Sequence, residues 1–210
     1  MSDPVSQLFD DLHFMLERMG WPTPMELARA LDIKVTDGPV PSINLDPPPT
    51  IQLPVSLRGF RRRHTLAHEI AHALMNWREI DAELLMYYAP ECAHSNLEAL
   101  ANHIAGLIAI PPPIFQKAMQ RYGFSPTTMT YLARVTGAPL EIAMDRVIYE
   151  SDSYRRAAML FKRNMLIDFA STIWLEADLF DVIPDPRERF PGIVLQTMDE
   201  GVLLGTWGES

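Results

Sequence analysis

The amino-acid sequence predicts an α+β protein that is mostly helical, with a small β-sheet and a short β-rich C-terminal tail. Three observations lead to this class. Apolar residues recur at helical spacing in most segments between residues 5 and 150. Short extended segments rich in proline lie within residues 32–55. After about residue 151 the pattern changes to short apolar runs separated by turn residues, which is typical of β-hairpins.

The composition is that of a globular protein with room for a substantial core. Of the 210 residues, 48% are hydrophobic and 21% are charged. The formal net charge of −9 disfavours binding to nucleic-acid phosphates. The single cysteine, Cys92, excludes an intrachain disulfide and favours a reducing compartment. The sequence has no signal-peptide pattern and no apolar run long enough to span a membrane, so we expect a cytoplasmic protein without membrane contact.

The first 55 residues predict two helices followed by three strands. Residues 3–20 carry an apolar stripe at helical spacing, and a glycine ends it. Thr23 is the expected N-cap of the next helix, because Glu26 follows three residues later in the pattern of a capping box. The extended segments suit a small sheet with proline at its edges, and they lie at 32–38, 42–46 and 50–55.

The middle of the chain is predicted to be helical. One helix follows a basic cluster at residues 58–63 and carries the sequence HTLAHEIAHAL. The pattern leaves the structure of the connection at 78–95 open. Residues 96–110 form the next expected helix, which the prolines at 111–113 must end. Three short helices are expected after it, at 112–123, 125–137 and 139–151.

The tail from residue 151 onward predicts two hairpins. The first spans residues 156–171 and turns at Arg163–Asn164, and the second spans residues 192–207 with Asp-Glu-Gly at its turn. An acidic loop broken by prolines, residues 176–189, separates them. No catalytic pattern occurs in this tail, so we expect a small sheet that packs on the core or binds a partner.

Residues 68–72 fit the pattern H-E-x-x-H. On a helix, residues four apart lie one above the other, so His68 and His72 can reach a single metal ion. Two imidazole ligands at this spacing form half of a catalytic zinc site. Glu69 is then the candidate general base, which takes a proton from water and passes it to the leaving amine. The alternative is a partly buried helix whose histidines are incidental, because the short pattern also arises by chance.

A hydrolytic zinc site usually has three protein ligands and one open position. The sequence offers His64, His94, Glu98 and His103, among others, for the third. His64 lies one turn before His68, and a third ligand from the same straight helix would strain a tetrahedral arrangement. We therefore expect the third ligand on the helix at 96–110.

The two helices together resemble those of the ImmA/IrrE family of metallopeptidases. That family joins a helix F-T-x-A-H-E-x-x-H to a helix E-x-x-A-N-x-F-A-x-x-L-L-M-P, and this chain keeps the register of the second pattern from Glu98 to Pro111. The resemblance extends over about residues 5–150. His64 and Ile104 stand where the family usually has phenylalanine, and Ala-Ile replaces Leu-Met before Pro111. His64 is expected either to cover the apolar side of its helix or to hydrogen-bond a carboxylate near the site.

The resemblance implies both a metal site and an activity. It assigns Glu98 as the third zinc ligand beside His68 and His72, with Glu69 as the catalytic base, and it places His103 at a variable position that points away from the metal. The same ligands also accept manganese, iron or cobalt. The implied activity is that of a zinc metalloendopeptidase whose partner is a protein substrate, a helix-turn-helix transcriptional repressor. Cleavage would relieve repression in a stress response or in a mobile element.

The expected organisation has three segments: a zincin-like metallopeptidase core at 1–115, a helical segment resembling a helix-turn-helix at 116–150 packed on the core, and a small β-rich accessory tail at 151–210. The helical segment offers few side chains for reading bases, so direct DNA binding is disfavoured. The basic cluster predicts a solvated loop or a contact with an acidic partner. A second function stays open, that of a non-hydrolytic regulator whose metal core is a scaffold for binding protein or DNA. The sequence leaves the oligomeric state open.

Overall fold

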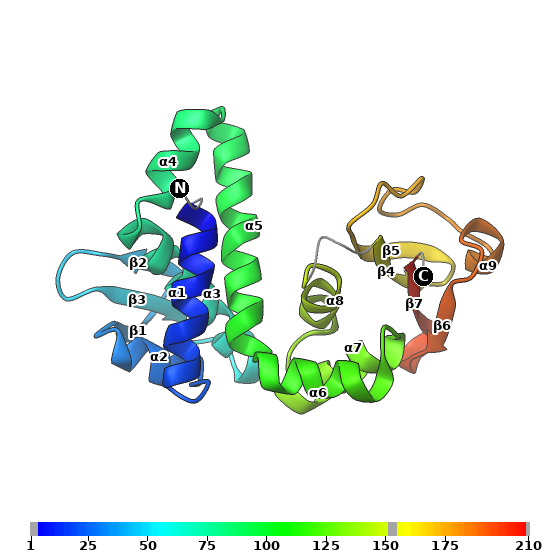
Figure 1. Ribbon diagram of the computed structural model, residues 1–210, viewed down its shortest axis with the longest axis horizontal. Helices are drawn as coiled ribbons and strands as arrows, with labels where there is room; N and C mark the ends of the chain where they lie inside the picture. Colours follow the sequence, from blue (N-terminus) through cyan, green and yellow to red (C-terminus); the bar gives the residue numbers. More distant parts are fainter. Residues whose placement is uncertain (1–3, 151–154, 209–210) are drawn as a thin grey trace. The chain divides into compact units, whose positions relative to one another are not determined.

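The computed structural model describes residues 4–150 and 155–208 (Figure 1). The chain divides into two compact units, Met1–Pro111 and Pro112–Ser210. Each unit has a hydrophobic core of its own. The boundary falls among the three consecutive prolines, which lack the backbone N–H that a continuous helix needs.

The first unit combines helices with a small mixed sheet. Strand β3 is the centre of that sheet, with β1 parallel to it on one side and β2 antiparallel to it on the other. Strands β1 and β2 are therefore its edges. The described elements are α1 (Pro4–Arg18), α2 (Pro24–Ala30), β1 (Lys34–Gly38), β2 (Ser42–Asn44), β3 (Thr50–Pro54), α3 (Gly59–Trp77), α4 (Ile80–Tyr87) and α5 (Pro90–Ala109).

Local sequence determines where two helices of this unit begin. The capping box before α2 is confirmed, because the Thr23 N–H donates to Glu26 Oε2 at 2.8 Å and the Glu26 N–H donates back to the Thr23 hydroxyl. Helix α5 begins at Pro90, earlier than the expected residue 96, and α4 fills most of the connection that the pattern left open. A proline at the first helical position loses no hydrogen bond and already has a helical φ, so it favours this early start.

The core of the first unit lies where α3 packs against α5 and the sheet. Figure 1 shows the long α5 beside α1, with α3 behind them. Small side chains allow the backbones of α3 and α5 to approach each other, since Ala67 and Ala71 of α3 and Ala101 and Ala105 of α5 are all fully buried. This close packing brings the H-E-x-x-H segment of α3 next to the middle of α5.

The second unit combines helices with an antiparallel four-stranded sheet in the order β5-β4-β7-β6. Both predicted hairpins are confirmed, and the first turns through Arg163 and Asn164 with φ of 51° and 65°, as a two-residue turn requires. The described elements are α6 (Pro112–Tyr122), α7 (Pro126–Thr136), α8 (Leu140–Ile148), β4 (Arg156–Lys162), β5 (Met165–Ser171), α9 (Pro186–Arg189), β6 (Val194–Thr197), the 3-10 helix η1 (Asp199–Gly201) and β7 (Val202–Gly208).

The helical segment and the β-rich tail share this second unit. Helix α8 contacts β4 and β5, and α7 contacts β6 and β7. The α+β class is confirmed, while packing of α6–α8 on the first unit stays a prediction.

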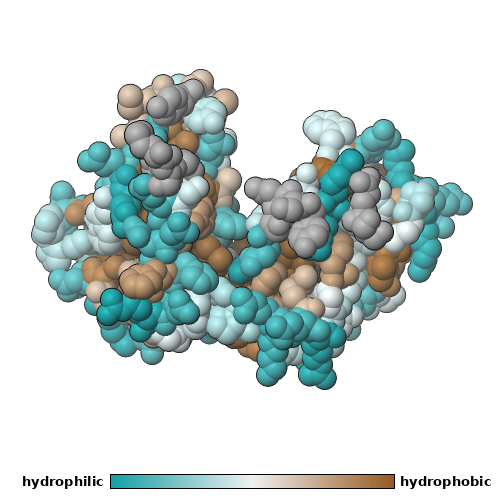
Figure 2. Space-filling view, viewed as in Figure 1, coloured by the Kyte–Doolittle hydropathy of each residue, from teal (hydrophilic) through white to brown (hydrophobic). Residues whose placement is uncertain are grey.

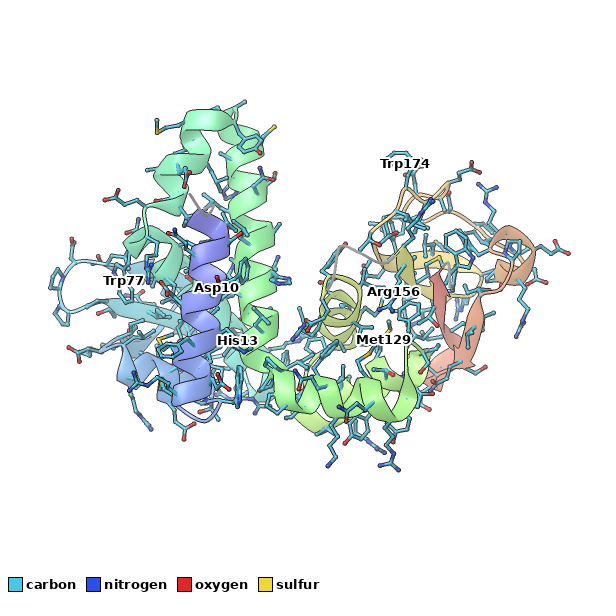
Figure 3. The ribbon with its side chains drawn as sticks, viewed as in Figure 1. Asp10, His13, Trp77, Met129, Arg156 and Trp174 are labelled. Carbon is cyan, nitrogen blue, oxygen red and sulfur yellow. The ribbon has the colours of Figure 1, made fainter. Side chains whose placement is uncertain are left out.

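The exposed surface is mixed in character. On the face shown in Figure 2, hydrophilic and hydrophobic residues are interspersed over both units. Trp174, in the loop after β5, is 90% exposed and points outward in Figure 3. Among the described residues, no helix is both long enough and apolar enough to span a lipid bilayer.

Candidate metal centre

Three of the predicted site residues meet where α3 and α5 lie side by side. His68 and His72 lie one turn apart on α3, and their Nε2 atoms are 3.1 Å apart. Glu98 of α5 reaches across, with Oε2 at 3.4 Å from His68 Nε2 and Oε1 at 3.4 Å from His72 Nε2. These residues form the one group of three or more His, Cys, Asp or Glu in the described chain that is close enough to hold a metal ion.

The spacing of these atoms matches what a tetrahedral metal requires. Ligand atoms about 2.0–2.1 Å from zinc at tetrahedral angles are roughly 3.3 Å from one another. The two imidazole Nε2 atoms are 3.1 Å apart, and each lies 3.4 Å from a different oxygen of the Glu98 carboxylate, Oε2 for His68 and Oε1 for His72, so the distances are close to that value. The donor set of two imidazole nitrogens and one carboxylate oxygen is also one that zinc accepts. The cluster could therefore bind a metal ion through three ligands.

Asn102 fixes the orientation of the His68 ring. It lies one turn beyond Glu98 on α5, and its Oδ1 is 3.0 Å from His68 Nδ1. With Oδ1 as acceptor, the ring carries its proton on Nδ1 and directs the lone pair of Nε2 toward Glu98 and His72. No role for Asn102 was predicted from the sequence. Its spacing of four from Glu98 was the signal that could have placed it on the same side of the helix.

The surroundings favour neutral His72, which is the form that binds metal. Burial lowers the pKa of His72 from its ordinary value, and the nearby His68 lowers it further. Glu98 acts in the opposite direction, since its negative charge raises the pKa of His72. Burial is the largest of these effects.

Glu69 differs from Glu98 in its environment. Its side chain is buried, with 8% of the residue exposed. Burial is the main cause that raises the pKa of its carboxyl group; the charge of Glu98 also raises this pKa, while His68 lowers it. Glu69 is therefore a carboxyl group close to the cluster that holds a proton more strongly than an exposed glutamate does.

The other histidines of the first unit lie outside the cluster. His64 packs its ring on Phe60 at 5.7 Å, burial lowers its pKa, and its buried Nε2 has no hydrogen-bond partner among the described residues. This agrees with the expectation that His64 covers the apolar side of the helix. His103 contacts the ring of Phe9 on α1. His13, also on α1 (Figure 3), is exposed and contacts the ring of Trp21.

The basic cluster is not a loop, because Arg61, Arg62 and Arg63 lie in the first turns of α3 and Arg58 is its N-cap residue, and it serves partly to join α3 to the sheet. Arg62 forms an ion pair with Asp37 of β1 at 2.9 Å and donates to the carbonyl oxygen of Pro54 at 3.2 Å. Arg58 donates to the carbonyl oxygen of Val55. Arg62 therefore holds the start of α3 against the strands, while Arg58 bonds within the connection between β3 and α3.

A pocket of about 320 Å³ adjoins the cluster and is partly lined by His72 and Glu98. Edge strand β2 contributes Ile43 to its wall. A larger cavity of about 520 Å³ lies in the second unit, but none of the four predicted site residues lines it. Of these two cavities, the smaller one is thus the one that adjoins the candidate metal ligands.

The fold and the three-residue cluster define a protein of the metallopeptidase-like class. The family model described as the IrrE N-terminal-like domain matches residues 28–147, more than half of the sequence, and the chain belongs to this peptidase family. The resemblance inferred from the two helix motifs is thereby confirmed. Among curated proteins, no sequence matches that of this chain.

A solved structure has a similar fold. A transcriptional regulator of Mycobacterium tuberculosis superposes with a TM-score of 0.63 and 15% sequence identity, over 95% of this chain and 75% of that chain. At this level of identity the similarity shows the fold alone.

Proposed function

We propose that the protein is a zinc-dependent endopeptidase in which His68, His72 and Glu98 bind the metal and Glu69 is the catalytic base. The observation that carries this proposal is the meeting of the three side chains: the two imidazole Nε2 atoms are 3.1 Å apart and each lies 3.4 Å from one of the two Glu98 carboxylate oxygens, which suits a shared ion. Three protein ligands leave one position open, which distinguishes a catalytic zinc site from a closed structural one.

Different residues of the chain would have different roles in peptide hydrolysis. Zinc, when bound, polarises the peptide carbonyl and makes a water molecule acidic at neutral pH. Glu69 accepts the proton of the attacking water and later donates it to the leaving amine. Its raised pKa suits this exchange, because the carboxyl group must hold the proton long enough to transfer it. Asn102 keeps the His68 ring in the tautomer that leaves Nε2 unprotonated.

An extended peptide has a place to bind next to the cluster. Strand β2 is an edge of its sheet and contacts α3. An edge strand offers backbone N–H and C=O groups to a further strand, and a substrate bound in this way would be held in an extended conformation. We propose that this edge positions the peptide bond that is cleaved.

The proposed substrate is a helix-turn-helix transcriptional repressor. The motifs on α3 and α5 resemble those of the ImmA/IrrE family, and this resemblance implies repressor cleavage. The structural neighbour is itself named a transcriptional regulator, so that protein also has a role in transcription. Cleavage would separate the repressor from DNA, in a stress response or in a mobile element.

The proposal is tested with Glu69→Gln, which removes the proton acceptor and keeps the size of the side chain. We expect purified Glu69→Gln to contain one zinc ion per chain by mass spectrometry of the metal, as the wild type does, and to leave a co-encoded repressor uncut. The matched control is Glu17→Gln, the same change at an exposed position of α1 in the same unit. Repressor cleavage by Glu69→Gln at the wild-type rate would rule out the assigned base.

The alternative function is a non-hydrolytic regulator that uses the metal core as a scaffold. It predicts that Glu69→Gln retains full regulatory activity in cells and that the metal-loaded wild type cuts no repressor. A version that binds DNA also predicts a DNA mobility shift that weakens steeply as salt is raised.

A further inference from the structure

The pocket beside the cluster extends away from it along α3 and α5. His72 and Glu98 line the end next to the cluster. Asn76 lies one turn after His72 on α3, so the pocket runs over about 6 Å of helix rise. His94, one turn before Glu98 on α5, lines the same stretch because the two helices run antiparallel. A substrate side chain in this pocket would therefore start beside the cleaved bond and point away from it.

The walls of the pocket are apolar for most of their length. Ile43 and Leu45 contribute from β2 and the residue just after it, Met75 from α3 and Leu97 from α5. A volume of about 320 Å³ is at the small end of the range for ligand pockets, about 300–1,000 Å³. It therefore suits a single long side chain with an aliphatic stem.

The far end of the pocket carries a fixed carboxylate. Asp81, in the first turn of α4, lines the pocket, and its Oδ2 accepts a hydrogen bond of 3.0 Å from Asn76 Nδ2. This bond holds the carboxylate in place. The titratable residues of the lining are His72, Asp81, His94 and Glu98, and of the two carboxylates only Asp81 lies outside the proposed metal ligands.

We propose that this pocket selects a lysine or arginine side chain of the substrate, next to the cleaved bond, and that Asp81 is the residue that recognises its cationic end. This inference rests on the proposed peptidase function and names the specificity of the same site. Lysine and arginine combine an aliphatic stem with a charged end, which matches apolar walls that lead to a carboxylate. A glutamate side chain would be repelled by Asp81, and a purely apolar side chain would bring no positive charge to pair with this carboxylate.

The first test uses cleavage of a peptide library. Peptides produced from a bacterial proteome by a glutamate-specific protease are incubated with the zinc-loaded wild type, and mass spectrometry identifies the residues on either side of each new end. We expect lysine and arginine to be enriched about tenfold at one flanking position. Asp81→Asn should lose this enrichment, Asp81→Lys should favour aspartate there, and Glu83→Gln on the same helix should behave as the wild type.

The second test measures binding without catalysis. Lysine hydroxamate and norleucine hydroxamate both bind zinc and differ mainly in the terminal ammonium group. Calorimetry with zinc-loaded Glu69→Gln should show lysine hydroxamate binding about tenfold more tightly. Adding Asp81→Asn to this variant should remove the difference. Thermal unfolding and zinc content of the Asp81 variants show whether they are folded and metal-loaded.

The two tests separate the specificity from the activity. If the wild type cuts peptides without preference for lysine or arginine and both hydroxamates bind equally, the specificity proposal is wrong and the peptidase stands. If no peptide is cut but the hydroxamate preference depends on Asp81, the pocket stands and the peptidase does not. If Asp81→Asn and Asp81→Lys lower the unfolding temperature and leave both preferences unchanged, Asp81 only stabilises the first turn of α4, and the proposal fails.

Discussion

The Nδ1 atom of His68 lies 3.0 Å from Oδ1 of Asn102, so a residue of α5 sets the ring orientation of a residue of α3. Hydrogen bonds of this kind to metal-binding histidines typically change metal affinity or activity by about 10–100-fold. Loss of this hydrogen bond is therefore expected to weaken metal binding measurably.

The Asn102→Ala variant should bind zinc about 10–100-fold more weakly than the wild type, because His68 loses its fixed tautomer. Asn102→Asp keeps an acceptor at the same place and should stay close to the wild type. Competition with a chromophoric chelator measures the affinity. Asn96→Ala, on the same helix, is the control. Equal affinity of Asn102→Ala and the wild type would contradict the role of this hydrogen bond.

Addition of zinc should stabilise the folded protein against unfolding. A ligand that binds the folded chain alone contributes about 2.7 kcal/mol when its free concentration is 100 times the Kd. We expect the unfolding temperature, followed by circular dichroism, to rise with zinc after treatment with a chelator. In Glu98→Ala this rise should disappear, whereas Glu17→Ala, at an exposed position of α1, should retain it. An unchanged response in Glu98→Ala would remove Glu98 from the ligand set.

The stability of the second unit should depend on the protonation of Asp145. Burial is the main cause that raises the pKa of Asp145 from 3.8 to about 6, and the charges of Asp168 and Glu141 add to it. The folded state thus binds this proton more strongly than the unfolded chain does. The stability associated with protonated Asp145 is full below pH 3.8 and is lost as the pH rises through about 6.

Asp145→Asn should therefore increase the free energy of unfolding at pH 7.5 by up to about 3 kcal/mol and should have little effect near pH 3.5. Urea unfolding at a series of pH values gives the difference between the variant and the wild type. Asp199→Asn, at an exposed turn, is the control. A difference that stays constant with pH would show that Asp145 titrates normally.

Ile104 should be a major contributor to the stability of the first unit. It replaces the phenylalanine that the family pattern has at this position, and it is completely buried on α5. Ile104→Ala should lower the free energy of unfolding by about 2–5 kcal/mol through lost burial and the cavity left behind. Leu85→Ala, on the exposed part of α4, should change it by less than about 0.5 kcal/mol. Denaturant unfolding compares the two.

The sequence predicted the parts of the site that follow from local patterns. His68, Glu69 and His72 fall on one helix at the H-E-x-x-H spacing, which indicates a metal site, although so short a pattern also arises by chance. Glu98 required the second motif, because nothing in its immediate surroundings distinguishes it from a glutamate such as Glu83. The partners of these residues depend on the way in which α3 packs against α5.

Other features could not be predicted because they depend on tertiary structure. The early start of α5 at Pro90 lies in a polar segment without apolar periodicity, so the pattern gave no helix there. The pocket combines β2, α3, α4 and α5. The position of Asp81 in the pocket lining, hydrogen-bonded to Asn76, depends on the packing of α4 and could not be predicted from the sequence.

The alanines between α3 and α5 have a consequence for the kinetics of metal uptake. Ala67, Ala71, Ala101 and Ala105 are all fully buried, so the separation of the two helix backbones is set by close contact. The proposed ligand atoms are then held close together without the ion, so zinc binding would require little loss of conformational entropy. We expect zinc to associate in one fast step without a slow rearrangement of the chain, and to dissociate slowly once it is bound.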